Sequence, residues 1–161
     1  MRLFYYLFIT FILISCSNNV ELIFDEDNGG LFLPTGFQSL VVHEGVGQSR
    51  HIAVNENEDI YVKLRLDYGR KGNVALRDKN GDGKADIIQR FGDYPNDGRF
   101  ATEMRINDGY LYYSSERVVY RQKLNPDLLV PDSPVEVILT DPFPIRWHNA
   151  KSIAFDKQDN M

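Results

Sequence analysis

A short pattern of strand, polar turn and strand occurs three times in this chain, and no other feature constrains its fold as strongly. The first copy pairs residues 52–55 with 60–62, and the second pairs 104–107 with 111–113. The third begins at residues 153–156. The copies start at Ile52, Met104 and Ile153, so they lie 52 and 49 residues apart. A repeat of this length is typical of a four-stranded propeller blade and is longer than most helical repeats.

The rest of the sequence has the pattern of an all-β protein. Short runs rich in valine, isoleucine, tyrosine and phenylalanine alternate with glycine, asparagine and aspartate, without a long stretch of helical periodicity. Such spacing fits a sandwich or a propeller, and the repeat favours the propeller. The predicted strands are 37–43, 51–54, 60–66, 73–77, 87–91, 102–106, 110–114, 118–123, 135–139 and 151–155.

The repeat also predicts that this sequence is the front part of a longer protein. About two blades are present, and Met161 stands where Ile60 stands in the first copy. A propeller protects its sheet edges by closing a ring of roughly four to eight blades. We therefore expect an incomplete ring, with little or no catalytic activity in this stretch by itself.

The amino end resembles a bacterial lipoprotein signal. Residues 1–15 contain a positive start and a short apolar run, which ends at Leu13-Ile14-Ser15-Cys16. This ending matches a lipobox, so the Cys16 sulfur is expected to carry the lipid, although an ordinary signal peptide with a chance cysteine is the alternative. Residues 16–32 would then form a tether and residues 33–161 the partial propeller. We expect an anchor on the periplasmic or extracellular side of a bacterial membrane.

Charge and cysteine content exclude some classes of protein. The formal net charge is −5 and no basic stripe is present, which argues against a nucleic-acid partner. Cys16 is the single cysteine, so the chain has no internal disulfide framework. We therefore expect no nucleic-acid partner and no protein crosslink through this cysteine.

Three stretches carry the most specific patterns of the chain. They read LFLPTGFQSLVVHEGVGQSRHIAVNENEDIYVKLR, GNVALRDKNGDGKADIIQRFG and HNAKSIAFDKQDNM, and together they reach from about Leu33 to the end. They resemble the amino-terminal third to half of glucose/sorbosone dehydrogenases, which use pyrroloquinoline quinone (PQQ). The most specific piece is His148 ahead of Ile153-Ala154-Phe155-Asp156. The resemblance implies a six-bladed propeller with quinone and substrate at one mouth of the central channel.

The resemblance implies that His148 is the catalytic base. Oxidation of an alcohol releases a proton from oxygen as hydride leaves carbon, and histidine titrates near neutral pH. The simpler alternative is a hydrogen-bonded loop histidine beside Trp147. Arg50 and His51, ahead of the first repeat copy, are weaker candidates for binding the cofactor.

A second candidate site is the loop from Asp78 to Asp86. Its alternating oxygen-bearing residues, followed by a glycine, match the first half of an EF-hand loop, but Gln89 stands where the usual glutamate would be. A charged hairpin turn without metal is the alternative. The candidate ligands for a structural Ca²⁺ are Asp78, Asn80, Asp82, Lys84 through its carbonyl, and Asp86.

Two functions from different classes follow. The first is a dehydrogenase that passes electrons from a sugar or polyol to PQQ and then to an acceptor that the sequence does not identify. The second is a non-catalytic, calcium-stabilised propeller module that binds carbohydrate or protein at the cell surface. Fold alone does not separate them, because propellers host both kinds of protein.

Overall fold

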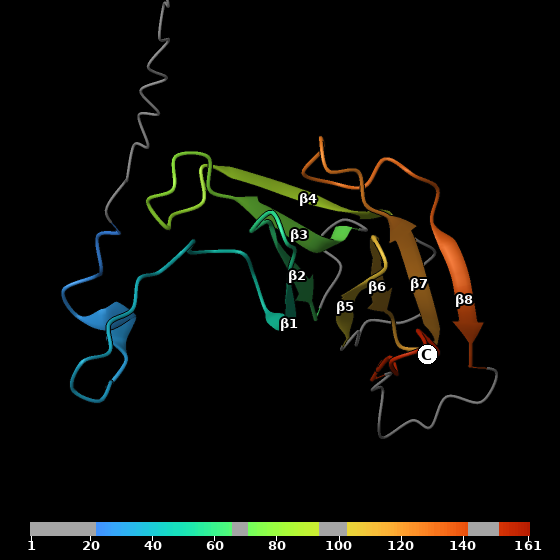
Figure 1. The fold of residues 1–161 in the computed structure, drawn as a ribbon, viewed down its shortest axis with the longest axis horizontal. Helices are drawn as coiled ribbons and strands as arrows, with labels where there is room; N and C mark the ends of the chain where they lie inside the picture. The colour runs from blue at the N-terminus through green and yellow to red at the C-terminus, as the bar shows by residue number, and fades with distance from the viewer. Residues whose placement is uncertain (1–21, 66–70, 94–102, 142–151) are drawn as a thin grey trace, which may run out of the picture.

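The computed structural model describes residues 22–65, 71–93, 103–141 and 152–161 (Figure 1). These residues form an all-β structure with two antiparallel four-stranded sheets and one short 3₁₀ helix, η1 (Asn28–Gly30). The all-β prediction is therefore confirmed.

The first sheet is a meander in which consecutive strands pair in the order β1-β2-β3-β4. A β-bulge shifts the register of β1 and β2 between Ser49 and His51. The strands are β1 (Ser49–Val54), β2 (Ile60–Leu64), β3 (Lys71–Arg77) and β4 (Ile87–Asp93). Sequence-adjacent antiparallel pairing is what short polar connections allow.

The second sheet repeats this arrangement in the order β5-β6-β7-β8. Its strands are β5 (Met104–Asn107), β6 (Tyr110–Ser114), β7 (Val118–Lys123) and β8 (Glu136–Thr140). In Figure 1 both sheets spread outward from β1 and β5, which lie next to each other near the centre. The first strand of each sheet is therefore the inner one.

The two inner hairpins have equivalent pairing but different turns. Val54 pairs with Ile60 in the first sheet, and Ile106 pairs with Leu111 in the second. The second hairpin closes through Asp108 and Gly109, both with positive φ (46° and 71°), as a two-residue hairpin turn requires. The repeat thus predicted the pairing of both hairpins correctly.

The main hydrophobic core lies between the facing surfaces of the two sheets. Successive side chains of a strand point to opposite faces of its sheet, so every second side chain can enter this layer. Tyr61 and Phe91 of the first sheet meet edge to face, with ring centroids 6.1 Å apart. The buried members of this core are Tyr61, Ala75, Phe91, Met104, Leu111, Tyr113, Val118, Tyr120 and Leu129.

The opposite face of the second sheet is covered by the third copy of the repeat. Ile153 and Phe155 pack against Tyr112 and Val119, and the Tyr112 and Phe155 rings lie 4.8 Å apart. Met104 and Ile153, the first residues of the second and third copies, are 0% and 4% exposed, whereas Ile52 of the first copy is 60% exposed. Each later copy is therefore covered by the sheet that precedes it in the chain.

The third copy keeps the turn geometry of the first. In the first copy the Asn55 amide donates to the Asp59 carbonyl (2.9 Å), and the Glu58 amide donates to the Asn55 carbonyl (2.9 Å). The third copy has the same two bonds, from Asp156 to Asn160 (3.0 Å) and from Asp159 to Asp156 (3.1 Å). Glu58 and Asp159 also share a positive φ (68° and 61°). The similarity extends to backbone conformation at this turn.

Two predicted strands are wrong where the structure describes them. Residues 37–43 form no strand, because their bonds go to separate partners: the Val41 amide donates to the Asp25 carboxylate and the Val42 carbonyl accepts from Ala85. Residues 152–155 form no strand either, since no described strand pairs with them. An extended segment becomes a strand only when a neighbouring segment forms a hydrogen-bonded ladder with it.

Tyr61 predicts a loss of stability at alkaline pH. Burial and the nearby Asp59 carboxylate raise the pKa of its phenol to about 12, despite the opposing effect of Arg77. Because an ordinary tyrosine pKa is 10.0, this group stabilises the folded chain fully below pH 10, and its contribution is lost as the pH rises from 10 to 12. We expect the ionisation of Tyr61 to lower the free energy of unfolding by about 2–3 kcal/mol above pH 12.

Urea unfolding of the wild type and of Tyr61→Phe at pH 9 and pH 11.5 tests this expectation. At pH 9 the variant should be less stable by about 1 kcal/mol, because the Tyr61 hydroxyl no longer donates to the Leu129 carbonyl (3.0 Å). The difference should shrink at pH 11.5. Equal losses of stability in both proteins between the two pH values would contradict the assignment.

No helix in the described part of the chain is long and apolar enough to cross a membrane. The predicted signal peptide (residues 1–15) and Cys16 lie outside the described residues. The lipid anchor therefore stays a prediction.

Candidate functional site

The ends of the two inner strands bring together a small cluster of ionisable side chains. His51 lies in β1, and Glu103 directly precedes β5. Both occupy the position just before the repeated pattern, ahead of Ile52 and Met104 respectively. Because β1 and β5 are neighbours, equivalent positions of two repeat copies meet at this place.

Glu103 is the buried centre of this cluster, with only 4% of its surface exposed. Its Oε1 lies 3.0 Å from Nε2 of His51 and 3.3 Å from Nε of Arg105. Backbone amides complete its surroundings: Met104 donates to Oε1 (3.1 Å) and Ile153 donates to Oε2 (3.3 Å). One carboxylate thus links the beginnings of all three repeat copies.

The cluster combines a buried carboxylate with a partly exposed histidine. A buried carboxylate is expensive unless polar groups surround it. Glu103 accepts hydrogen bonds from two backbone amides and has the side-chain nitrogens of His51 and Arg105 within ion-pair distance. The side chain of His51 is 31% exposed and lines a hollow of about 370 Å³ with Ser49, Arg50 and Ile52. A histidine held by a carboxylate at an accessible surface is an arrangement suited to proton transfer.

The structure describes some of the predicted site residues and leaves others outside the described ranges. Arg50 and His51 lie at the hollow, whereas His148 lies outside the described residues. Glu103 and Arg105 were missed by the sequence analysis. Aligning the repeat copies places Glu103 opposite His51 and was the available signal, but burial of that carboxylate depends on how the sheets pack.

The Asp78 loop is organised by its own backbone. The Asp78 carboxylate accepts from the amides of Asn80 (3.0 Å), Gly81 (2.7 Å) and Gly83 (2.7 Å). Asp82 continues the pattern, since Asn80 Nδ2 donates to its Oδ2 (3.1 Å). Burial raises the pKa of Asp78, but these backbone hydrogen bonds outweigh it and the net pKa lies below 3.8. The loop is therefore a self-capped turn between β3 and β4.

The remaining candidate ligands of the loop are also engaged. The Asp86 carboxylate accepts from the Lys79 amide (2.7 Å), and the Lys84 amide donates to Asp82 Oδ1 (2.8 Å). Among residues 22–65, 71–93, 103–141 and 152–161, no three histidine, cysteine, aspartate or glutamate side chains are grouped to hold a metal. The geometry thus favours the hydrogen-bonded turn, and calcium binding stays a prediction.

A calcium titration tests that prediction. If the loop binds Ca²⁺, the free energy of unfolding should rise by about 2.7 kcal/mol at a concentration 100 times Kd. Asp82→Asn should weaken this response, whereas Asp127→Asn, which removes an exposed carboxylate from another loop, should not. The readout is the urea midpoint with CaCl₂ or with EDTA. Identical midpoints at millimolar calcium would exclude the loop as a site.

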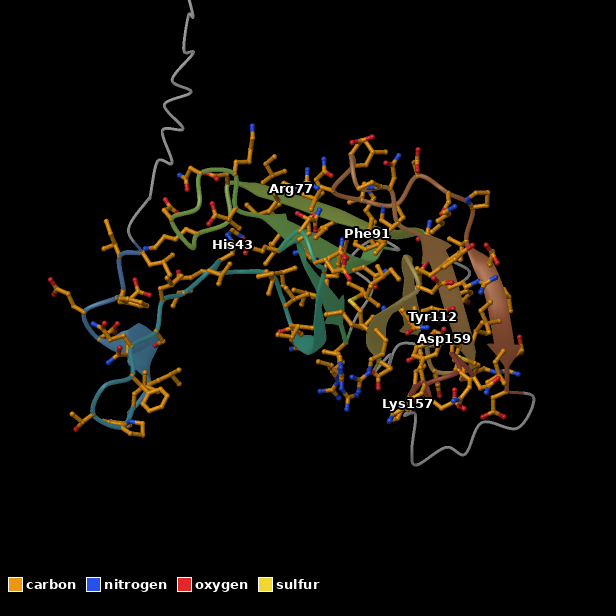
Figure 2. The ribbon with its side chains drawn as sticks, viewed as in Figure 1. His43, Arg77, Phe91, Tyr112, Lys157 and Asp159 are labelled. Carbon is orange, nitrogen blue, oxygen red and sulfur yellow. The ribbon has the colours of Figure 1, made fainter. Side chains whose placement is uncertain are left out.

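The amino-terminal segment, residues 22–44, docks against the Asp78 loop. Lys84 Nζ lies 3.4 Å from the Asp25 carboxylate, and the Ala85 amide donates to the Val42 carbonyl (2.9 Å). A hollow of about 590 Å³ between the two segments is lined by Asp25, Asp27, Gly29, Gly30, Val41, Val42, His43, Glu44, Lys84 and Ala85. Figure 2 labels His43 in this region, away from the inner strands. Residues 22–32, part of the predicted tether, are thus tied to the first sheet.

Gly83→Ala is expected to disrupt this docking. Gly83 has a φ of +89°, and a Cβ there would lie 2.7 Å from Leu40 Cδ2 and 3.0 Å from Leu22 Cδ2. The backbone strain alone costs about 1–2 kcal/mol, and the overlap adds to it. Gly109→Ala is the matched control, since its φ is +71° but nothing lies within 4 Å. Thermal unfolding should show a larger loss for Gly83→Ala, and limited proteolysis should then cut the amino-terminal segment faster. Equal losses in the two variants would argue against close docking.

A second buried ion pair lies at the other end of the first sheet. Arg77 Nε and Nη2 donate to Oδ1 and Oδ2 of Asp59, both at 2.6 Å. Asn57 Nδ2 also donates to Asp59 Oδ2 (2.9 Å). The Asp59 side chain is 1% exposed and that of Arg77, labelled in Figure 2, is 25% exposed. This pair joins the start of β2 to the end of β3 and has a structural role.

Comparison with known proteins identifies no relative of this chain. No model of a known family, no curated protein and no solved structure matches it.

Proposed function

We propose that this chain forms consecutive blades of a β-propeller and belongs to a PQQ-dependent sugar dehydrogenase of the glucose/sorbosone type. The observation that carries the fold proposal is the regular order of packing. The first sheet covers the second copy at Met104, and the second sheet covers the third copy at Ile153. Sheets that pack in one direction around neighbouring inner strands are what successive blades require.

The chemical proposal rests on the inner strands. Their ends hold Arg50, His51 and Arg105, cationic or protonatable side chains in a chain whose net charge is −5. PQQ carries carboxylates, and such donors fit them. Arg50, His51 and Arg105 would therefore hold the cofactor, which supplies a two-electron acceptor for the hydride of an alcohol carbon.

His148 is proposed as the base that removes the hydroxyl proton, on the basis of the family resemblance. It precedes Ile153 by five residues, and Ile153 is held by Glu103 through its amide. The proposed substrate is a sugar or a polyol. With Cys16 lipidated, oxidation would take place on the periplasmic or extracellular side of the membrane, and the electron acceptor would be found there.

The second candidate is a non-catalytic, calcium-stabilised propeller module that binds carbohydrate or protein at the cell surface. Calcium in this module would be held by the Asp78 loop, where Asp78, Asn80 and Asp82 are linked by hydrogen bonds within one turn. In that case the carboxylates would stabilise a binding surface and the cluster at Glu103 would be structural.

The test uses the protein produced from its complete gene, loaded with PQQ and Ca²⁺. Dye reduction is measured with a panel of aldoses and polyols, for the wild type and for His148→Ala. Substrate-dependent reduction that is lost in His148→Ala supports the dehydrogenase. A loaded wild-type protein that reduces no dye with any of these substrates, yet binds carbohydrate, supports the second candidate.

A further inference from the structure

The loop formed by residues 28–39 carries apolar side chains at its tip. Phe32 is fully exposed, and Leu31 and Phe37 are 59% and 68% exposed. No charged residue occurs from Asn28 to Val42. Apolar side chains that gather on an exposed segment are typical of a surface that contacts a membrane or a protein. The loop is therefore a candidate interaction surface.

Hydrogen bonds give this loop a defined shape. At its base the Ser39 hydroxyl donates to the Asn28 carbonyl (2.7 Å), and the Ser39 amide donates to the Asn28 side-chain oxygen (3.1 Å). Near its tip the Phe37 amide donates to the Pro34 carbonyl (3.1 Å). This bond closes a turn between Phe32 and Phe37. The loop thus presents its apolar side chains from a fixed base.

The loop lies at the end of the molecule farthest from the second sheet (Figure 1). The base of the segment is joined to the first sheet, because the Asp25 carboxylate accepts from the Val41 amide (2.6 Å) and lies 3.4 Å from Lys84 Nζ. These contacts leave the tip of the loop exposed. Another surface can therefore approach the tip without disturbing the sheets.

The predicted lipid on Cys16 places this loop near a membrane. Leu22, the first described residue, follows Cys16 by six residues. A fully extended chain spans about 3.3–3.6 Å per residue, so Leu22 lies within about 20 Å of Cys16 whatever path the chain takes. The loop begins six residues after Leu22. A bilayer that holds the lipid is therefore within reach of the loop, which favours a membrane over a protein as its partner.

We propose that the loop of residues 28–39 inserts its apolar tip into the membrane that holds the lipid of Cys16. Leucine and phenylalanine side chains gain free energy when they leave water. Insertion buries no charge, because residues 28–42 carry none. An apolar segment at the boundary between headgroups and acyl chains adds a second attachment to a covalent lipid. This inference rests on the lipidation of Cys16 in the proposed function and is independent of the dehydrogenase reaction.

Fluorescence quenching in vesicles tests the insertion. The complete lipidated protein carrying Phe32→Trp is reconstituted in phosphatidylcholine vesicles with ordinary or brominated acyl chains, and the emission of the unsubstituted protein is subtracted. Interfacial segments bury their apolar side about 5–10 Å deep, so brominated chains should lower the added emission by about half. Val137→Trp is the matched control, since Val137 is 60% exposed on β8 at the other end of the molecule. Its emission should not change.

A charge at the tip separates insertion of the loop from mere proximity to the membrane. Adding Phe37→Asp to Phe32→Trp should remove most of the quenching, because a carboxylate is costly to move out of water. Phe37 is exposed, so the urea midpoint of this variant should match that of its parent. Val137→Asp should leave the quenching unchanged. Equal quenching with and without Phe37→Asp would overturn the inference.

The remaining outcomes separate this inference from the proposed function. Mass spectrometry of the amino-terminal peptide shows whether Cys16 carries lipid, and a Cys16 without lipid would overturn the anchor and the inference together. In a lipidated protein, Phe32→Trp emission that is quenched no more than that of Val137→Trp would overturn the inference alone. If that unquenched emission is also blue-shifted, protein covers the loop instead of lipid. A protein that oxidises no sugar would overturn the proposed reaction and leave the inference intact.

Discussion

Replacing Arg77 with methionine is expected to destabilise the chain by about 3–5 kcal/mol, because it leaves a buried carboxylate without its cation. Asp59 is 1% exposed and receives both Arg77 hydrogen bonds at 2.6 Å. After the substitution, Asn57 is the remaining side-chain donor to Asp59 in the described structure. Chemical unfolding at pH 7, followed by intrinsic fluorescence or circular dichroism, measures the loss.

A double variant and a matched control separate charge burial from other effects of Arg77. Adding Asp59→Asn to Arg77→Met should recover at least half of the loss, since a neutral amide is less costly to bury than a charge. Glu136→Gln weakens the exposed pair with Arg121 (2.9 Å), whose two side chains are 46% and 32% exposed. It should cost less than about 1 kcal/mol. Equal effects of Arg77→Met and Glu136→Gln would refute the assignment of Asp59 as a buried, charged residue.

Replacing Met104 with alanine is expected to cost about 2–5 kcal/mol through the cavity that it leaves between the sheets. Met104 is 0% exposed and packs in the core shared by both sheets. The prediction tests the arrangement of the sheets, because Met104 is buried through contact with the sheet that precedes it. Equilibrium unfolding in urea gives the magnitude.

Equivalent positions of the other two repeat copies provide the comparison. Ile52→Ala alters a side chain that is 60% exposed, so it should change stability by less than about 1 kcal/mol. Ile153→Ala should resemble Met104→Ala, because Ile153 is 4% exposed against Tyr112 and Val119. Similar losses at residues 52 and 104 would contradict the order of packing on which the propeller proposal depends.

The strands of the described structure could largely be read from local sequence. The predicted ranges 110–114 and 118–123 coincide with β6 and β7, because alternating apolar residues and flanking turn residues agree there. The prediction failed at residues 37–43, whose apolar residues also suggest a strand. Their hydrogen-bond partners include Asp25, Asn28 and Ala85, and no local pattern encodes contacts with such separate segments.

The candidate site also combines features that local sequence indicates with contacts that it does not. The chemistry of histidine and the repeat pattern drew attention to His51, but Glu103 carried no signal of its own, since a lone glutamate before a strand is common on protein surfaces. Its role depends on three segments meeting, and each is distant from the others in the chain. The Asp78 loop was recognised from its spacing, and the structure then showed its oxygens hydrogen-bonded to backbone amides.

The amino-acid sequence by itself determined the all-β class, the repeat and the inner hairpin pairing, because these depend on side-chain alternation and turn residues within a few positions. Only the tertiary structure decided which face of each sheet is covered, which of Ile52, Met104 and Ile153 are buried, and that Glu103 holds His51. These properties arise when surfaces distant in sequence exclude water together. Burial and the strength of an ion pair belong to that assembled environment rather than to any single residue.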